Sequence, residues 1–254
     1  MYRYGIIGDD MRMRYLYESL VGDGYSARFG GTESADSLIE DCDIIVLPVN
    51  AHVILKKCTG KTVLGGFTGE YETPRGALVK NYLENRRYTV KNALATAEGA
   101  LLVAMQHSPD ILAGKRTLVT GFGNIGRLLC IKLLSAGCRV TVCARSALAR
   151  AEAENLGAET CDFPALFLHP SDIIFNTVPD IVIGRQALLA LSPSSFVIEL
   201  ASAPGGVDIN AARELGISVI SAQGLPGKYC PAFAGRILKD TVIELTEGVS
   251  ANER

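Results

Sequence analysis

Histidine is scarce in this 254-residue chain, which has three histidines beside seven cysteines. No two cysteines are spaced as C-x-x-C, so the sequence lacks the usual zinc-binding pattern. The cysteine count is odd, and Cys130 and Cys143 lie inside apolar runs, where a thiol behaves as a small hydrophobic group. We therefore expect no metal site and no disulfides, which is typical of a protein in a reducing cytoplasm.

The sequence also lacks a strong excess of either charge and long apolar runs. Its formal net charge is −2, with 20% charged residues. That balance excludes the basic surface expected of a nucleic-acid-binding protein or of a basic membrane-binding face. No apolar run has the length of a transmembrane helix, and the opening MYRYGIIGDD enters a predicted strand instead of a signal peptide. We expect a globular protein that binds neither nucleic acid nor membranes.

The order of the predicted elements indicates two α/β domains. Apolar runs of strand length alternate with helical runs along the chain, which is the pattern of parallel sheets. We predict an α/β fold with two Rossmann-like domains, the second a doubly wound parallel sheet that binds a dinucleotide. Residues 1–90 would form a domain for substrate or a partner, and residues 109–230 the dinucleotide domain. Helix 91–108 would join them, and helix 231–249 would pack across.

The strongest local pattern is a set of glycines between two predicted strands. After the apolar run 117–120, Gly121, Gly123 and Gly126 follow in G-x-G-x-x-G spacing, and a helical run begins at Ile125. In this pattern the glycines allow a tight turn, close approach of the backbone to a pyrophosphate, and close helix packing. The helix N-terminus supplies N–H groups and a positive dipole end for the phosphates. The pattern predicts a dinucleotide site; the alternative is a glycine-rich turn that binds nothing.

The end of the next predicted strand indicates which dinucleotide binds. An NAD site usually has Asp or Glu there, to hold the ribose 2′-hydroxyl. This chain has Ala144-Arg145-Ser146 instead. A guanidinium and a hydroxyl would bind a 2′-phosphate, which a carboxylate would repel. We predict NADP in preference to NAD; the alternative is that Arg145 is a solvated loop residue.

Three loops rich in glycine or proline follow predicted strands of the second domain, at residues 121–126, 203–206 and 224–227. Ligands of doubly wound sheets bind outside the carboxyl ends of the strands, so these loops predict a ligand along one sheet edge. The predicted coenzyme contacts are Gly121, Phe122, Gly123, Asn124, Ile125, Gly126, Ala144, Arg145, Ser146, Thr177, Val178, Pro179, Ala201, Gly224, Leu225 and Pro226.

Polar side chains outside these loops are candidates for a substrate site. Asp10 and Arg12 follow the first predicted strand, and the joining helix carries Asn92, Thr96 and Glu98. A long helix between two α/β domains would have its middle at their cleft. The alternative is that Thr96 and Glu98 cap the helix or face solvent.

Five segments occur in an order that resembles the A subunits of dipicolinate synthases: NALATAEGA (92–100), VTGFGNIG (119–126), CARS (143–146), LASAPGGVD (200–208) and GLPGK (224–228). The resemblance covers most of the chain. It implies an NADP-linked oxidoreductase that dehydrogenates the cyclic product of dihydrodipicolinate synthase, dihydrodipicolinate or its hydrated precursor, to dipicolinate during endospore formation. It also implies a partner, a flavoprotein-like B subunit. We further expect a homo-oligomer in the cytoplasm.

A dicarboxylate heterocycle as substrate would need cations and N–H donors for its carboxylates. The predicted substrate contacts are Arg12, Asn92, Thr96, Ser202, Gly205 and Gly206. A base would take a ring proton; Glu98 is the first candidate, Asp10 the second and His52 the third, and Lys228 is a further catalytic candidate and a carboxylate-binding cation. Two other functions remain open: another NADP-dependent dehydrogenase of the shikimate or amino-acid type, and a non-catalytic NADP-sensing subunit.

Overall fold

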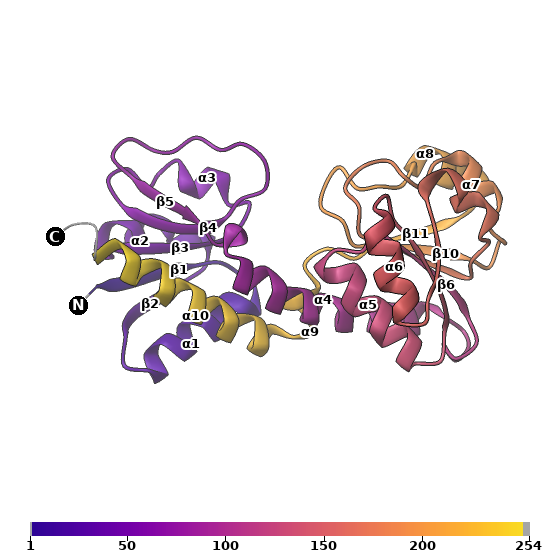
Figure 1. Cartoon of the computed structure of the whole chain (residues 1–254). Coiled ribbons are helices and arrows are strands. Elements are labelled where there is room, and N and C mark those ends of the chain that lie inside the picture. Colours follow the sequence, from indigo (N-terminus) through magenta and orange to yellow (C-terminus); the bar gives the residue numbers. More distant parts are fainter. Residues whose placement is uncertain (1, 251–254) are drawn as a thin grey trace. The chain divides into compact units, whose positions relative to one another are not determined.

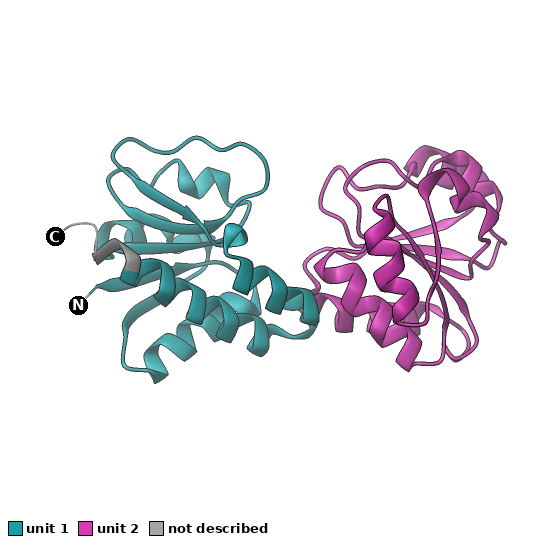
Figure 2. Ribbon diagram, in the orientation of Figure 1, with its two compact units in different colours: residues 1–95, 226–254 teal, residues 96–225 magenta. Residues whose placement is uncertain are grey.

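The computed structural model describes residues 2–250 and divides into two compact units (Figures 1 and 2). Unit 1 comprises Met1–Ala95 and Pro226–Arg254, and unit 2 comprises Thr96–Leu225. Each unit contains a fully parallel sheet with helices on its faces, so the predicted α/β fold class is confirmed. The division falls inside a long helix, which both units therefore share.

The sheet of unit 1 has five strands in the order β2-β1-β3-β4-β5. The strands are β1 (Arg3–Ile7), β2 (Ser26–Gly30), β3 (Ile44–Val49), β4 (Thr62–Gly66) and β5 (Leu78–Asn81). The helices between them are α1 (Met11–Gly22), α2 (Ala35–Asp41) and α3 (His52–Leu55), with 3-10 turns η1 (Thr32–Ser34) and η2 (Tyr82–Glu84). This is the flavodoxin-like order of a doubly wound sheet, with its switch point between β1 and β3.

Helix α1 packs against the carboxy-terminal helix α10 (Pro231–Ser250) over one face of this sheet (Figure 1). Gly235 marks their closest approach, since a Cβ there would lie 2.6 Å from the Cβ of Tyr15 and 2.8 Å from the backbone N of Leu16. Met13, Leu16 and Leu20 of α1 are fully buried in the resulting core. The sequence that follows unit 2 thus completes the core of unit 1.

The sheet of unit 2 has six strands in the order β11-β10-β9-β6-β7-β8. They are β6 (Arg116–Thr120), β7 (Arg139–Cys143), β8 (Glu159–Cys161), β9 (Ile173–Asn176), β10 (Phe196–Glu199) and β11 (Ser218–Ser221). Numbered from β6, this is the 3-2-1-4-5-6 order of a Rossmann sheet. The chain reverses direction across the sheet between β6 and β9, which makes that pair the switch point.

The helices of unit 2 include three short ones that the sequence does not indicate. They are α4 (Arg86–His107, shared with unit 1), α5 (Asn124–Ser135), α6 (Ala147–Asn155), the 3-10 segment η3 (Phe163–Leu168), α7 (Arg185–Leu189), α8 (Ile209–Leu215) and α9 (Leu225–Tyr229, which crosses into unit 1). Helices α7, α8 and α9 are too short to show a helical period of apolar residues. Helix α4 begins at Arg86, before the predicted start at residue 91.

Two kinds of feature are absent from the described residues. No helix within residues 2–250 combines the length and apolar character needed to cross a membrane. Over the same residues, no group of three or more His, Cys, Asp or Glu side chains is arranged to hold a metal ion. The seven cysteines are free thiols, six of them buried.

Candidate functional site

The glycine loop after β6 contains two glycines that the fold requires and one that it does not. Gly121 has a φ of +84°, and a Cβ there would lie 2.6 Å from Thr177 Oγ1. A Cβ on Gly126 would lie 2.2 Å from the carbonyl oxygen of Gly121. Gly123, in contrast, has an ordinary φ of −81°, and a Cβ there would meet no atom within 4 Å. Its missing side chain leaves open space beside the backbone, as close approach of a pyrophosphate requires.

Helix α5 begins at this loop with no side chain capping its N-terminus. Gly123 is the N-cap residue and makes no side-chain hydrogen bond to the first turn. The twelve-residue helix therefore presents first-turn N–H groups and the positive end of its dipole to an anion. Beside it, Phe122 is held by Arg127, whose Cζ lies 5.1 Å from the ring centroid. These residues fit the pyrophosphate of a dinucleotide.

The end of β7 carries basic and hydroxyl groups and no carboxylate. Arg145 and Ser146 are exposed, and Ser146 Oγ caps α6 by accepting a hydrogen bond from Ala149 N at 3.3 Å. Arg150 Nη1 donates to the carbonyl oxygens of Ala144 and Arg145 at 2.7 and 3.0 Å. The sequence prediction missed Arg150, whose only signal is its place one turn after the cap. It fixes the backbone of the predicted 2′-phosphate site.

The loops after β9 and β10 are joined by a buried polar network that the sequence does not indicate. Asn176 accepts a hydrogen bond from Thr120 Oγ1 and donates to the carbonyl of Val178 at 2.9 Å. It also donates to the buried carboxylate of Glu199 at 2.7 Å. Thr177 Oγ1 donates to the carbonyl of Thr120 at 2.6 Å. The predicted coenzyme residues Thr177 and Val178 are thus fixed to the end of β6, next to the glycine loop.

The predicted substrate contacts in the loop after β10 differ in accessibility. Ser202 is exposed. The N–H groups of Gly205 and Gly206 are already engaged, with Ser202 O and Glu199 Oε2, each at 2.9 Å. A Cβ on Gly206 would also lie 2.3 Å from the carbonyl oxygen of Val178. A role in the loop's own structure therefore replaces the expected contact of these two N–H groups with a substrate carboxylate.

The loop after β11 leads into a packing contact. Leu225 is buried against α4, where a Cβ on Gly99 would lie 2.8 Å from its Cβ. This close approach explains a glycine in an Ala- and Leu-rich helix. Gly224 is exposed, with a φ of +70°, and Pro226 is buried. Of these three predicted coenzyme residues, Gly224 alone is exposed.

Asp10, Arg12 and the residues around Gly227 come together in unit 1. Asp10 caps α1 by accepting from Met13 N at 3.0 Å, and its other oxygen accepts from Arg12 Nη2 at 2.8 Å. A Cβ on Gly227 would lie 3.8 Å from both Asp10 and Arg12. The next residue, Lys228, is exposed, with its Nζ 5.0 Å from the Tyr229 ring centroid.

The Arg12 side chain is only 11% exposed and lies beside two buried tyrosines, Tyr82 and Tyr88. Burial raises the pKa of Tyr88, and the Arg12 guanidinium offsets that effect only in part. The phenol therefore stays neutral beside the cation. Among the described residues, Arg12 Nε has no hydrogen-bond partner. A fixed guanidinium with an unused donor suits a carboxylate.

The predicted residues of α4 lie in different surroundings. Asn92 is half-buried, and Thr96, one helical turn later, is buried. The Glu98 side chain is 54% exposed, and its carboxylate accepts from Lys132 Nζ of α5 at 3.0 Å. This ion pair gives Glu98 a surface partner that the sequence does not indicate.

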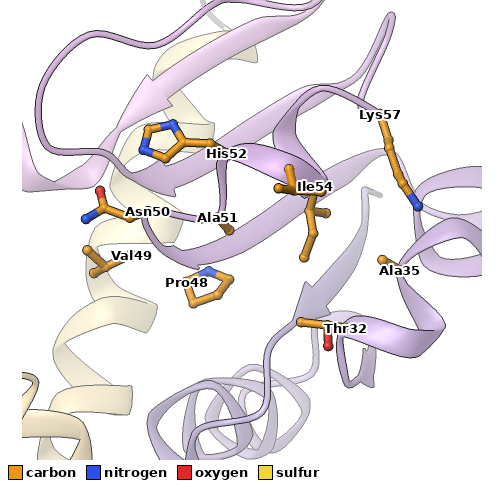
Figure 3. A pocket seen from close by; sticks show the side chains of 10 residues that line it. Thr32, Ala35, Pro48, Val49, Asn50, Ala51, His52, Ile54 and Lys57 are labelled. Atoms are coloured by element: carbon orange, nitrogen blue, oxygen red, sulfur yellow. The ribbon is translucent and has the colours of Figure 1, made fainter.

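Unit 1 also contains a cavity of about 420 Å³ at the carboxyl end of β3 (Figure 3). Pro48, Ala51 and Ile54 supply part of its apolar lining. His52, the third candidate base, lines it as well, and its ring centroid lies 5.5 Å from that of Phe67. The predicted substrate contacts are not among the residues that line this cavity.

Comparison with known proteins relates this geometry to one enzyme. The family of D-isomer specific 2-hydroxyacid dehydrogenases, NAD binding domain, matches residues 84–208. The A subunit of dipicolinate synthase from Bacillus subtilis (strain 168) is 32% identical over 178 residues, which are 69% of this chain and 60% of that protein. This chain is similar to that A subunit. The resemblance inferred from the motifs is thereby confirmed.

Solved structures of dipicolinate synthase A subunits have the same fold. The one from Bacillus halodurans has a TM-score of 0.82 and 25% identity, covering 96% of this chain and 97% of that chain. The one from Bacillus subtilis has a TM-score of 0.82 and 22% identity, covering 99% and 97%. The chain therefore carries the pyridine-dinucleotide-binding domain of an oxidoreductase.

Proposed function

We propose that the protein dehydrogenates dihydrodipicolinate, or its hydrated precursor, to dipicolinate with NADP as coenzyme, as a counterpart of the A subunit of dipicolinate synthase. The 32% identity to that protein is the observation that carries the proposal. The glycine loop and the uncapped α5 support a dinucleotide, and the cationic end of β7 supports a 2′-phosphate. By the same likeness, the protein would act as a homo-oligomer in the cytoplasm and would work with a B subunit.

The coenzyme would accept the hydride, and the protein would bind, orient and exclude water. The loop 121–126 would hold the pyrophosphate, and Arg145 with Ser146 the 2′-phosphate. Arg150 supports this assignment, since it fixes the carbonyls on both sides of the Ala144–Arg145 peptide. Thr177, Val178, Pro179 and Ala201 would lie along the nicotinamide half.

Coenzyme choice tests Arg145. In Arg145→Glu, affinity for NADP is expected to fall roughly 100-fold, because a charge-assisted hydrogen bond is lost and a repulsion is gained. Affinity for NAD should stay within a few-fold. Arg145 is exposed, so the fold is not affected. Fluorescence titration with NADPH and NADH measures both, with Arg213→Glu, another exposed arginine of unit 2, as the charge-matched control. Unchanged NADPH affinity in Arg145→Glu would make Arg145 a bystander.

The substrate carboxylates need fixed cations, and we assign this role to Arg12 and Lys228. Support comes from the buried guanidinium of Arg12, its unused Nε and the neighbouring Gly227–Lys228 segment. Asn92, Thr96 and Ser202 would add hydrogen bonds. Glu98 is the first choice as the base that takes the ring proton and Asp10 the second. The ion pairs of both favour the carboxylate form that a base needs.

The direct test is turnover by the purified protein. With NADP and freshly generated product of dihydrodipicolinate synthase, NADPH absorbance and the ultraviolet absorbance of dipicolinate should rise in equal amounts. Turnover of a shikimate-type or amino-acid substrate instead would establish a different dehydrogenase. Coenzyme binding without turnover of any of these substrates, with and without a B subunit, would indicate a nucleotide-sensing protein.

A further inference from the structure

Glu199, at the carboxyl end of β10, has a carboxylate inside the protein. The residue is 7% exposed. Its Oε1 accepts hydrogen bonds from Asn176 Nδ2 at 2.7 Å and from Ala201 N at 3.0 Å. Its Oε2 accepts from Gly206 N at 2.9 Å. One side chain thus holds the loop after β10 at two points and connects it to β9.

The charge of this carboxylate is not neutralised by a cation. All three groups that contact it are neutral N–H donors, and in residues 2–250 no Lys, Arg or His forms an ion pair with it. A carboxylic acid would have to place an O–H of its own, whereas a carboxylate only accepts. Both oxygens accept here, which is the pattern of the ionised form. A buried charge is retained in this way when hydrogen bonds replace water.

The position of Glu199 in the sheet relates this charge to one half of the coenzyme. A dinucleotide lies across the switch point of a doubly wound sheet, with its pyrophosphate at the first strand–helix turn. The proposed 2′-phosphate residues follow β7, on one side of that turn. The nicotinamide half would therefore lie over β9, β10 and β11, on the other side. Glu199 ends the middle one of these three strands.

We propose that Glu199 makes this site prefer the oxidised, positively charged nicotinamide over the reduced, neutral one. An unneutralised carboxylate acts over several ångströms in a low-dielectric interior, and it attracts only the charged ring. This preference rests on the proposed coenzyme site. Its consequence is that the oxidised coenzyme is bound ready for the substrate, and that hydride transfer, which removes the ring's charge, weakens the hold on the reduced product.

Glu199→Gln tests this, because it removes the charge and keeps the size of the side chain. Calorimetric titration should give a Kd for NADP⁺ that is raised roughly three- to tenfold relative to the Kd for NADPH. The adenosine fragment 2′,5′-ADP, which lacks nicotinamide, should bind as in the wild type. Glu199→Asp keeps the charge and should keep the wild-type ratio. A merely loosened loop would weaken both forms equally, and an unchanged NADP⁺/NADPH ratio in Glu199→Gln would overturn the proposal.

The unmodified protein provides a second measurement that does not depend on how the variant folds. Its Kd for NADP⁺ should be no larger than its Kd for NADPH. NADPH bound more than tenfold more tightly would overturn the preference. These titrations need no substrate, so a protein that binds both coenzymes in the expected ratio but forms no dipicolinate would refute the proposed reaction alone. A protein that binds neither would refute both.

Discussion

Gly123→Val is expected to lower the affinity for NADP at least 100-fold and to leave the fold intact. A side chain at this position meets no protein atom within 4 Å, and the backbone φ of −81° suits any residue. The space that valine would fill is the space that the pyrophosphate is proposed to occupy, beside the first-turn N–H groups of α5. Affinity is measured by calorimetry and folding by the thermal midpoint. Full coenzyme affinity in this variant would place the phosphates elsewhere.

Gly184→Val is the matched control for this prediction. Gly184 also precedes a helix as its N-cap residue, has a φ of −84°, and has open space where a Cβ would lie. Both variants therefore share the cost of valine at an N-cap, about 1 kcal/mol at most. Only the Gly123 variant should lose coenzyme affinity. Equal losses in the two variants would show that helix destabilisation, and not a blocked pyrophosphate, causes the effect.

Glu98→Gln should lower kcat by roughly two to four orders of magnitude if Glu98 is the general base. The carboxylate is half exposed and its ion pair with Lys132 lies at the surface. The free energy of unfolding should therefore change by less than about 1 kcal/mol. The assay is dipicolinate formation at saturating NADP and substrate.

Lys132→Gln separates the two roles of Glu98. It breaks the same ion pair but leaves the carboxylate in place, so its kcat should stay near that of the wild type. A near-native kcat in Glu98→Gln would remove Glu98 from the mechanism. Asp10→Asn would then be the variant to examine, since asparagine keeps the cap of α1 while the base is lost.

The dinucleotide fingerprint could be predicted because its signals are local. Strand, turn and helix between residues 116 and 135 follow from a few adjacent residues, and the structure has them in place. The edge strand β5 was missed because Leu78 and Lys80 are partly exposed and give no apolar alternation. The roles of the three glycines, alike in the sequence, separate only when their neighbours are known, as the open space at Gly123 shows.

Contacts between distant residues account for what the sequence could not indicate. Glu199 looks like the polar end of a strand until Asn176 and Gly206 are seen to donate to it. The same contact engages the Gly206 N–H, for which the sequence predicts a substrate contact. Arg12 is identifiable as a cation near a strand end, but its burial depends on Tyr82 and Tyr88, 70 and more residues away. Such side-chain environments are properties of the fold.

The proposed site accepts a nicotinamide dinucleotide with a phosphate on its adenosine ribose. Calorimetric titration of the wild-type protein with NADP and with NAD tests it most directly. The expected result is one binding site per chain, with NADP bound at least tenfold more tightly than NAD, since Arg145 and Ser146 offer donors that the extra phosphate alone can use. Folded protein that takes up neither coenzyme, or that binds NAD more tightly, would contradict this assignment.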